Sequence, residues 1–95
     1  MRLSKRIRRD LWTLALCVAF AACGSDSERI DTLIARGDVD REAARHREAV
    51  LQYRSALQLD PNRAAAHWGL AQSYLALQQV RDGLWELQES VRLDP

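Results

Sequence analysis

The hydrophobic positions of this chain follow two different patterns, one before and one after Cys23. Eleven of the twelve residues 11–22 are apolar and form an almost continuous run. After residue 30, the apolar residues are instead three or four positions apart, as in the series Leu84, Leu87 and Val91. That spacing places side chains on one face of a helix. The chain therefore divides into a short apolar segment and a helical region.

The helical region repeats with a period of 34 residues. Leu59-Asp60-Pro61 recurs as Leu93-Asp94-Pro95, and the same shift pairs small residues with small ones and large apolar residues with large ones. The pairs include Gly37 with Ala71, Ile34 with Trp68, Ala49 with Gly83, Val50 with Leu84, Tyr53 with Leu87, and Leu57 with Val91. Matching at one fixed offset is the signature of stacked supersecondary units.

Each unit is predicted to hold two helices. Pro61 cannot continue a helix, so the helix before it ends near Leu59 or Asp60, and Asn62 is the expected cap of the next one. The first helix, from about residue 31 to residue 43, is less regular than its counterpart in the second unit. Alanine is plentiful and strand-type alternation is absent, which predicts an all-α fold with short turns.

This pattern resembles the tetratricopeptide repeat (TPR), over roughly residues 30–95. The matching residues are Gly37, Ala49, Tyr53, Ala56 and Pro61 in the first unit, and Leu70, Ala71, Tyr74, Leu87 and Pro95 in the second. The departures are Gly83 in place of alanine, Ala44 and Gln78 in place of a turn glycine, and His67 in place of tryptophan. The resemblance implies helix-turn-helix units at 30–61 and 62–95, stacked as an α-solenoid. The alternative is a generic helical hairpin with coincidental prolines.

The amino-terminal segment has the features of an export signal, with a basic stretch, a short apolar run and small residues at its end. A twelve-residue helix is about 18 Å long, which is short of the roughly 30 Å hydrocarbon core of a membrane. Phe20-Ala21-Ala22-Cys23-Gly24 resembles the lipobox of bacterial lipoproteins. That resemblance implies a signal helix at 1–22, cleavage between Ala22 and Cys23, a diacylglycerol on the Cys23 thiol, and a short tether over 23–29. An ordinary cleaved signal, an uncleaved signal anchor and a twin-arginine signal are the alternatives.

Charge and side-chain chemistry exclude several classes of function. Residues 23–95 contain nine Arg, no Lys and twelve acidic residues, a balance unsuited to nucleic-acid binding. His46 and His67 lie in different units without a third ligand, so we expect no metal site, and each histidine is expected to be a turn or core residue. No phosphate-binding loop or catalytic triad is present, so we expect neither a cofactor nor an enzyme. The acids are expected on solvated helix faces, namely Glu42, Glu48, Glu86 and Glu89.

The TPR resemblance also implies a concave groove, lined by the first helix of each unit, that holds a protein or peptide partner. Its expected lining residues are Ile34, Asp38 and Arg41 from the first unit, and Trp68, Gln72 and Leu75 from the second. Trp68 is the strongest candidate, because buried tryptophans are common binding hot spots. The alternative is that Trp68 packs against the neighbouring helix.

Together these resemblances predict a membrane-tethered, non-enzymatic TPR adaptor in bacterial envelope assembly or export, such as pilus, outer-membrane protein or exopolysaccharide systems. The alternative is the anchoring module of a larger envelope enzyme with a catalytic domain beyond Pro95. Gly24 rather than Asp follows Cys23, which favours the outer membrane, facing the periplasm, over the outer face of the cytoplasmic membrane. Two units are fewer than the three commonly needed for stability, so we also expect a homo-oligomer or further repeats in cis.

Overall fold

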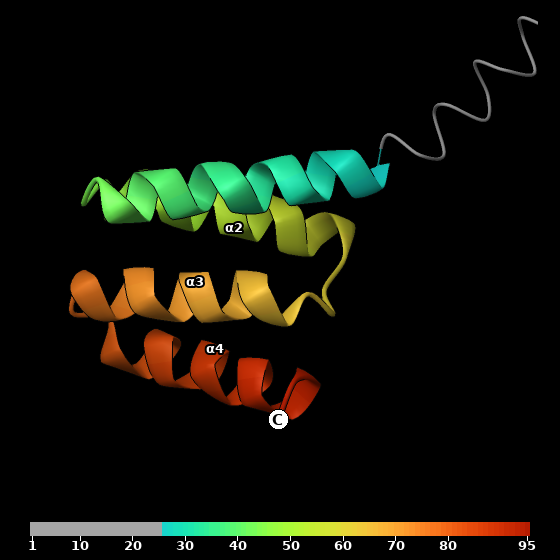
Figure 1. Ribbon diagram of the computed structural model, residues 1–95. Coiled ribbons are helices and arrows are strands. Elements are labelled where there is room, and N and C mark those ends of the chain that lie inside the picture. The colour runs from blue at the N-terminus through green and yellow to red at the C-terminus, as the bar shows by residue number, and fades with distance from the viewer. Residues whose placement is uncertain (1–25) are drawn as a thin grey trace, which may run out of the picture.

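The computed structural model describes residues 26–95, and these residues form helices and turns without a strand (Figure 1). The first helix covers residues 26–42, and it is followed by α2 (His46–Leu59), α3 (Ala64–Ala76) and α4 (Val80–Leu93). Successive helices run in opposite directions in one stack, with α3 packed against both α2 and α4 (Figure 1). The prediction of an all-α, TPR-type repeat fold is confirmed. The predicted signal segment and the lipidation site at Cys23 lie outside the described residues.

The 34-residue period is visible in the positions at which the helices begin and end. Both ends of α2 lie 34 residues before the corresponding ends of α4. The turns that precede these helices also match, because Ala44 has a φ of 61° and Gln78 a φ of 62°. In each turn the next amide, that of Arg45 or Gln79, donates to a carbonyl five residues earlier, at 2.8 and 2.9 Å. This is the Schellman helix ending, here built without the usual glycine.

The turn between the two units differs from the prediction at Asn62. The N-cap of α3 is Arg63 rather than Asn62, and it makes no side-chain capping bond. The carboxylate of Asp60 organises the turn instead, since it accepts the Asn62 amide at 3.0 Å and the Arg63 Nε at 3.1 Å. The expected cap is therefore wrong, because Asp60 already supplies the acceptor that closes this turn.

The first helix also begins earlier than the sequence pattern predicts. Residues 26–29 are helical, although they were expected in the tether. The acidic side chains of Asp26 and Glu28 suit the positive end of a helix dipole, and Thr32 donates to the Glu28 carbonyl at 2.8 Å. Ile30, one turn later, is buried and anchors this end of the helix.

The core of the described region is centred on Tyr53, whose side chain is fully buried. A Cβ on Gly37 would lie 2.7 Å from the Tyr53 ring, and a Cβ on Gly69 would lie 2.6 Å from it. The ring is therefore held between a glycine of the first helix and a glycine of α3. The remaining buried apolar residues surround it, namely Ile30, Ala49, Val50, Ala56, Ala66 and Leu70.

Candidate functional site

The outer side of α4 carries an apolar stripe that no described helix covers. The stripe consists of Val80, Leu84, Leu87 and Val91, and three of these side chains are 51–56% exposed. The residues 34 positions earlier lie on α2, where α3 packs against them. There Val50 is only 9% exposed and Tyr53 is fully buried. The same helix face is thus an internal interface in the first unit and an open surface in the second.

Two side chains of α3 extend this open surface. Trp68 is 48% exposed and lines a pocket of about 310 Å³ together with Ala65 and Ser90. Leu75 is 40% exposed and packs over Gly83, where a Cβ would lie 2.8 Å from its Cδ2. We call this surface the C-terminal face, and it comprises Trp68, Leu75, Val80, Leu84, Leu87 and Val91.

The six residues predicted to line a groove fall into two groups. Ile34 packs against the core, while Asp38 and Arg41 both bind the Tyr53 hydroxyl. These three side chains are therefore occupied within the fold, at the boundary between the units. Their counterparts at the 34-residue offset are Trp68, Gln72 and Leu75. Of these, Trp68 and Leu75 are exposed on the C-terminal face, and Gln72 is partly buried with its Oε1 unpaired.

The Tyr53 hydroxyl joins the first helix to α2. It donates to Asp38 Oδ1 at 2.5 Å and accepts from Arg41 Nε at 3.2 Å. Burial, followed by the hydrogen bond to Asp38, raises the pKa of Tyr53 to about 12. The hydrogen bond to Tyr53 is also the main cause that raises the pKa of Arg41. This hydroxyl is satisfied and protonated at neutral pH, which fits a structural role.

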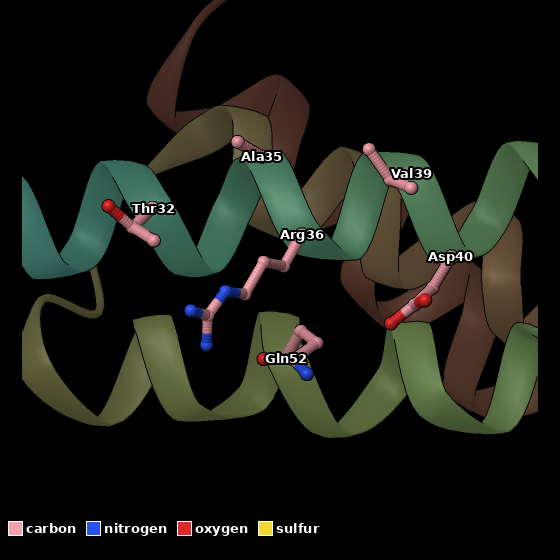
Figure 2. Close-up of a pocket in the computed structure, with 6 residues that line it drawn as sticks. All are labelled: Thr32, Ala35, Arg36, Val39, Asp40 and Gln52. Atoms are coloured by element: carbon pink, nitrogen blue, oxygen red, sulfur yellow. The ribbon is translucent and has the colours of Figure 1, made fainter.

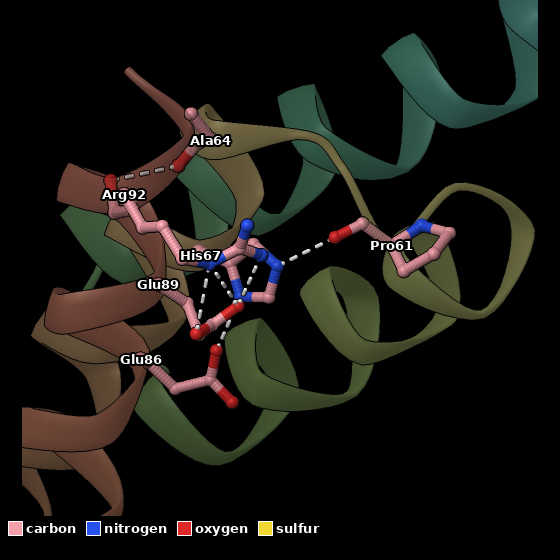
Figure 3. A network of polar contacts seen from close by, with 7 residues as sticks. Pro61, Ala64, His67, Glu86, Glu89 and Arg92 are labelled. Carbon is pink, nitrogen blue, oxygen red and sulfur yellow. Dashed lines mark hydrogen bonds and ion pairs between the residues drawn. The ribbon is translucent and has the colours of Figure 1, made fainter. Parts of the chain in front are cut away.

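His67 connects three parts of the second unit (Figure 3). Its Nδ1 lies 2.6 Å from Glu86 Oε2, and its Nε2 lies 2.8 Å from the Pro61 carbonyl oxygen. Because a carbonyl only accepts, Nε2 carries a proton and donates it to Pro61. Nδ1 and Glu86 then share a second proton between ring and carboxylate. His67 is a core residue, as expected, but Glu86 is not on a solvated face, which corrects the prediction for that residue.

Further polar contacts along α4 complete the network in Figure 3. Ser90 Oγ donates to the Ala64 carbonyl at 3.1 Å and ties the end of α4 to the start of α3. Arg92 pairs with Glu89 at 2.8 Å, and this hydrogen bond lowers the pKa of Glu89. Trp85 packs edge-on against His67, with ring centroids 6.5 Å apart. These contacts leave the apolar stripe of α4 free of charged side chains.

The opposite end of the stack carries a polar surface (Figure 2). A pocket of about 420 Å³ is lined by Gln52 of α2 and five residues of the first helix, namely Thr32, Ala35, Arg36, Val39 and Asp40. We call those five residues the N-terminal face. Their counterparts in α3 at the 34-residue offset are Ala66, Gly69, Leu70, Ser73 and Tyr74, of which the first four are buried. Arg36 and Asp40 thus stand where the second unit has Leu70 and Tyr74.

Two other classes of site were searched for within residues 26–95. Among these residues, no group of three or more His, Cys, Asp or Glu side chains could hold a metal ion. None of the helices in the same range combines the length and the apolar character needed to span a bilayer.

Sequence reasoning missed the two polar clusters around Tyr53 and His67. Glu86 is 19 residues from His67, and Asp38 is 15 residues from Tyr53. Neither separation belongs to a sequence motif, so only the stacking of the helices reveals the pairs.

Comparison with known proteins agrees with this architecture. The TPR repeat family model matches residues 37–78, a range that runs from the first helix through α2 and α3. The searches among curated proteins and among solved structures found no match. TPR repeats are generally non-enzymatic modules for protein–protein interaction. Residues 37–78 therefore carry a TPR repeat, and the chain is a TPR-type helical-repeat protein.

Proposed function

We propose that this chain is a membrane-tethered, non-enzymatic module that binds a protein partner in the bacterial envelope. The TPR repeat over residues 37–78 supports the protein-binding part of the proposal. The lipobox-like segment ending at Cys23 supports the tether. Two or three acyl chains on that cysteine would hold the chain firmly at a bilayer, whereas one chain binds only marginally.

The observation that carries the binding role is the C-terminal face. An apolar patch of this kind on a soluble surface usually marks an interaction site. Its counterpart in the first unit is covered by α3, so the shape of this face suits a helix. Trp68 offers a half-exposed aromatic ring beside a pocket, which is the geometry of a binding hot spot. The partner is therefore a protein that presents an apolar helix.

The envelope setting rests on the amino-terminal sequence. Gly24 after the cysteine favours the outer membrane, with the repeats facing the periplasm. In that place the module would serve the assembly or export of pili, outer-membrane proteins or exopolysaccharide. The short segment between Cys23 and the first helix would keep the C-terminal face close to the bilayer, within reach of other envelope proteins.

Photo-crosslinking in intact envelopes tests the binding role. A photoreactive residue at Trp68 should form protein adducts, and one at Leu51, which is 64% exposed on α2 away from the C-terminal face, should not. Equal yields at both positions, or no adduct at Trp68, would refute the assignment of this face. The tether is tested separately by the intact mass of the membrane-extracted protein. A Cys23→Ser variant should lose the acyl mass, and a wild-type protein without that mass would refute lipidation.

A further inference from the structure

We infer that the helix that covers the C-terminal face is supplied by a second copy of this chain, through a two-fold contact between C-terminal faces. This inference rests on the proposed function, because it names the partner of the same surface. It is carried by the internal interface between α2 and α3, together with the charges at the opposite end of the stack.

The internal interface shows what the C-terminal face requires. On α2 the stripe of Val50, Tyr53 and Leu57 is closed by α3, whose own packing side chains include Ala66 and Leu70. On α4 the corresponding Leu84 and Val91 are more than half exposed. A surface of this composition is completed by apolar side chains and small residues from a helix.

A second copy stacked head to tail does not meet that requirement. Its first helix would take the place of α3, and Arg36 would stand where Leu70 is 1% exposed. Asp40 would stand where Tyr74 packs. Asp40 already pairs with Arg45 at 2.8 Å, so it has no spare partner for a buried Arg36. Removing such charges from water costs more than the new contact returns. The N-terminal face therefore blocks this mode of assembly.

A two-fold contact avoids the charged face. In such an interface the same surface is used on both copies, so apolar side chains meet apolar side chains. The α3–α4 layer of one copy would lie on the α3–α4 layer of the other, which gives a four-helix arrangement. Within each layer the small residues Gly83 and Ser90 are buried between the two helices. Trp68 and Leu75 stand on one side of them and the α4 stripe on the other. This relief lets the two faces interlock.

The test is the molar mass of the full chain in detergent, measured by light scattering after size exclusion. The wild-type chain should have twice the monomer mass. Leu84→Glu should raise the dimer dissociation constant more than tenfold, and Val91→Glu should do the same. The matched control Leu51→Glu adds the same charge at an exposed position of α2, so it should remain dimeric. Circular dichroism of each variant checks that its helices are intact. A monomeric wild-type chain, or a dimer that Leu84→Glu and Val91→Glu leave unchanged, would overturn the inference.

Crosslinking separates this inference from the proposed function. With the photoreactive residue at Trp68, an adduct of twice the chain mass whose crosslinked peptide comes from α3 or α4 supports the two-fold contact. An adduct joined to the first helix of another copy would indicate head-to-tail stacking and overturn it. Adducts with other proteins alone would leave the proposed function standing and refute the second copy as partner. The absence of any adduct would refute both.

Discussion

Substitution of Gly69 by alanine should destabilise the fold, although alanine favours a helix. A new Cβ at this position would lie 2.6 Å from both Cε1 and the hydroxyl oxygen of Tyr53. Ordinary contacts between carbon atoms are about 3.5–4.0 Å, so the ring would have to move by about 1 Å. It cannot move freely, because Gly37 on the other side leaves equally little room.

The expected magnitude follows from two opposing effects. Alanine gains about 1 kcal/mol over glycine in a helix interior. Overpacking of a closed core costs about 1–3 kcal/mol, and contacts this short belong at the upper end of that range. Gly69→Ala should therefore lower the free energy of unfolding by about 1–2 kcal/mol. For a domain of this size, each kcal/mol lowers the melting temperature by about 4–8 °C.

Gly83→Ala is the matched control, since Gly83 is also a buried glycine inside a helix. Its Cβ would meet Leu75 Cδ2 at 2.8 Å, but that side chain is 40% exposed and can turn away. This variant should keep most of the helix gain and be as stable as the wild-type chain or more stable. Thermal denaturation of the full chain followed by circular dichroism measures both variants. If Gly69→Ala proved as stable as Gly83→Ala, the Tyr53 ring would not be confined as described.

Three further predictions concern the polar clusters and the turns. Because the pKa of Tyr53 is raised from 10.0 to about 12, its contribution to stability is full below pH 10 and is lost as the pH rises toward 12, by at most about 2.7 kcal/mol. Urea midpoints at pH 9 and pH 11.5 should show that loss, and Tyr53→Phe should show a smaller change over the same interval. Glu86→Ala should cost about 1–3 kcal/mol because it leaves the buried Nδ1 of His67 without a partner, whereas Glu86→Gln keeps a hydrogen bond and should cost less. Equal urea midpoints for the two variants would contradict that account. Ala44→Gly and Gln78→Gly should each raise the stability by about 1 kcal/mol, because they relieve a left-handed backbone, and a lower melting temperature for either would disprove it.

Much of the fold could be predicted from the sequence, because stacked repeats express their architecture as a period. The 34-residue offset predicted the paired helices, and it holds in the structure even for the backbone angles of Ala44 and Gln78. The cap of α3 could not be predicted in this way. It depends on whether Asp60 or Asn62 turns toward the chain, and both residues are good acceptors in a turn.

The candidate site was harder to predict, because the same repeat position plays different roles in the two units. Ile34 and Trp68 are equivalent by sequence offset, yet one packs against the core and the other is 48% exposed. The difference lies in what covers each unit, and a pattern within one helix does not contain that information. The pair of His67 and Glu86 was missed for a similar reason, since helix α4 places the carboxylate beside the ring across 19 residues of sequence.

The position of Tyr53 has a consequence for the order in which the chain folds. A protein is synthesised from its amino terminus at about 5–20 residues per second. The Tyr53 ring needs Gly37, made earlier, but also Gly69, which is made 16 residues later. Until α3 has emerged, the first helix and α2 lack one wall of the cavity that holds the ring. The first half of the repeat therefore stays loosely packed while it leaves the ribosome, a state that suits a chain still to be threaded through a narrow channel.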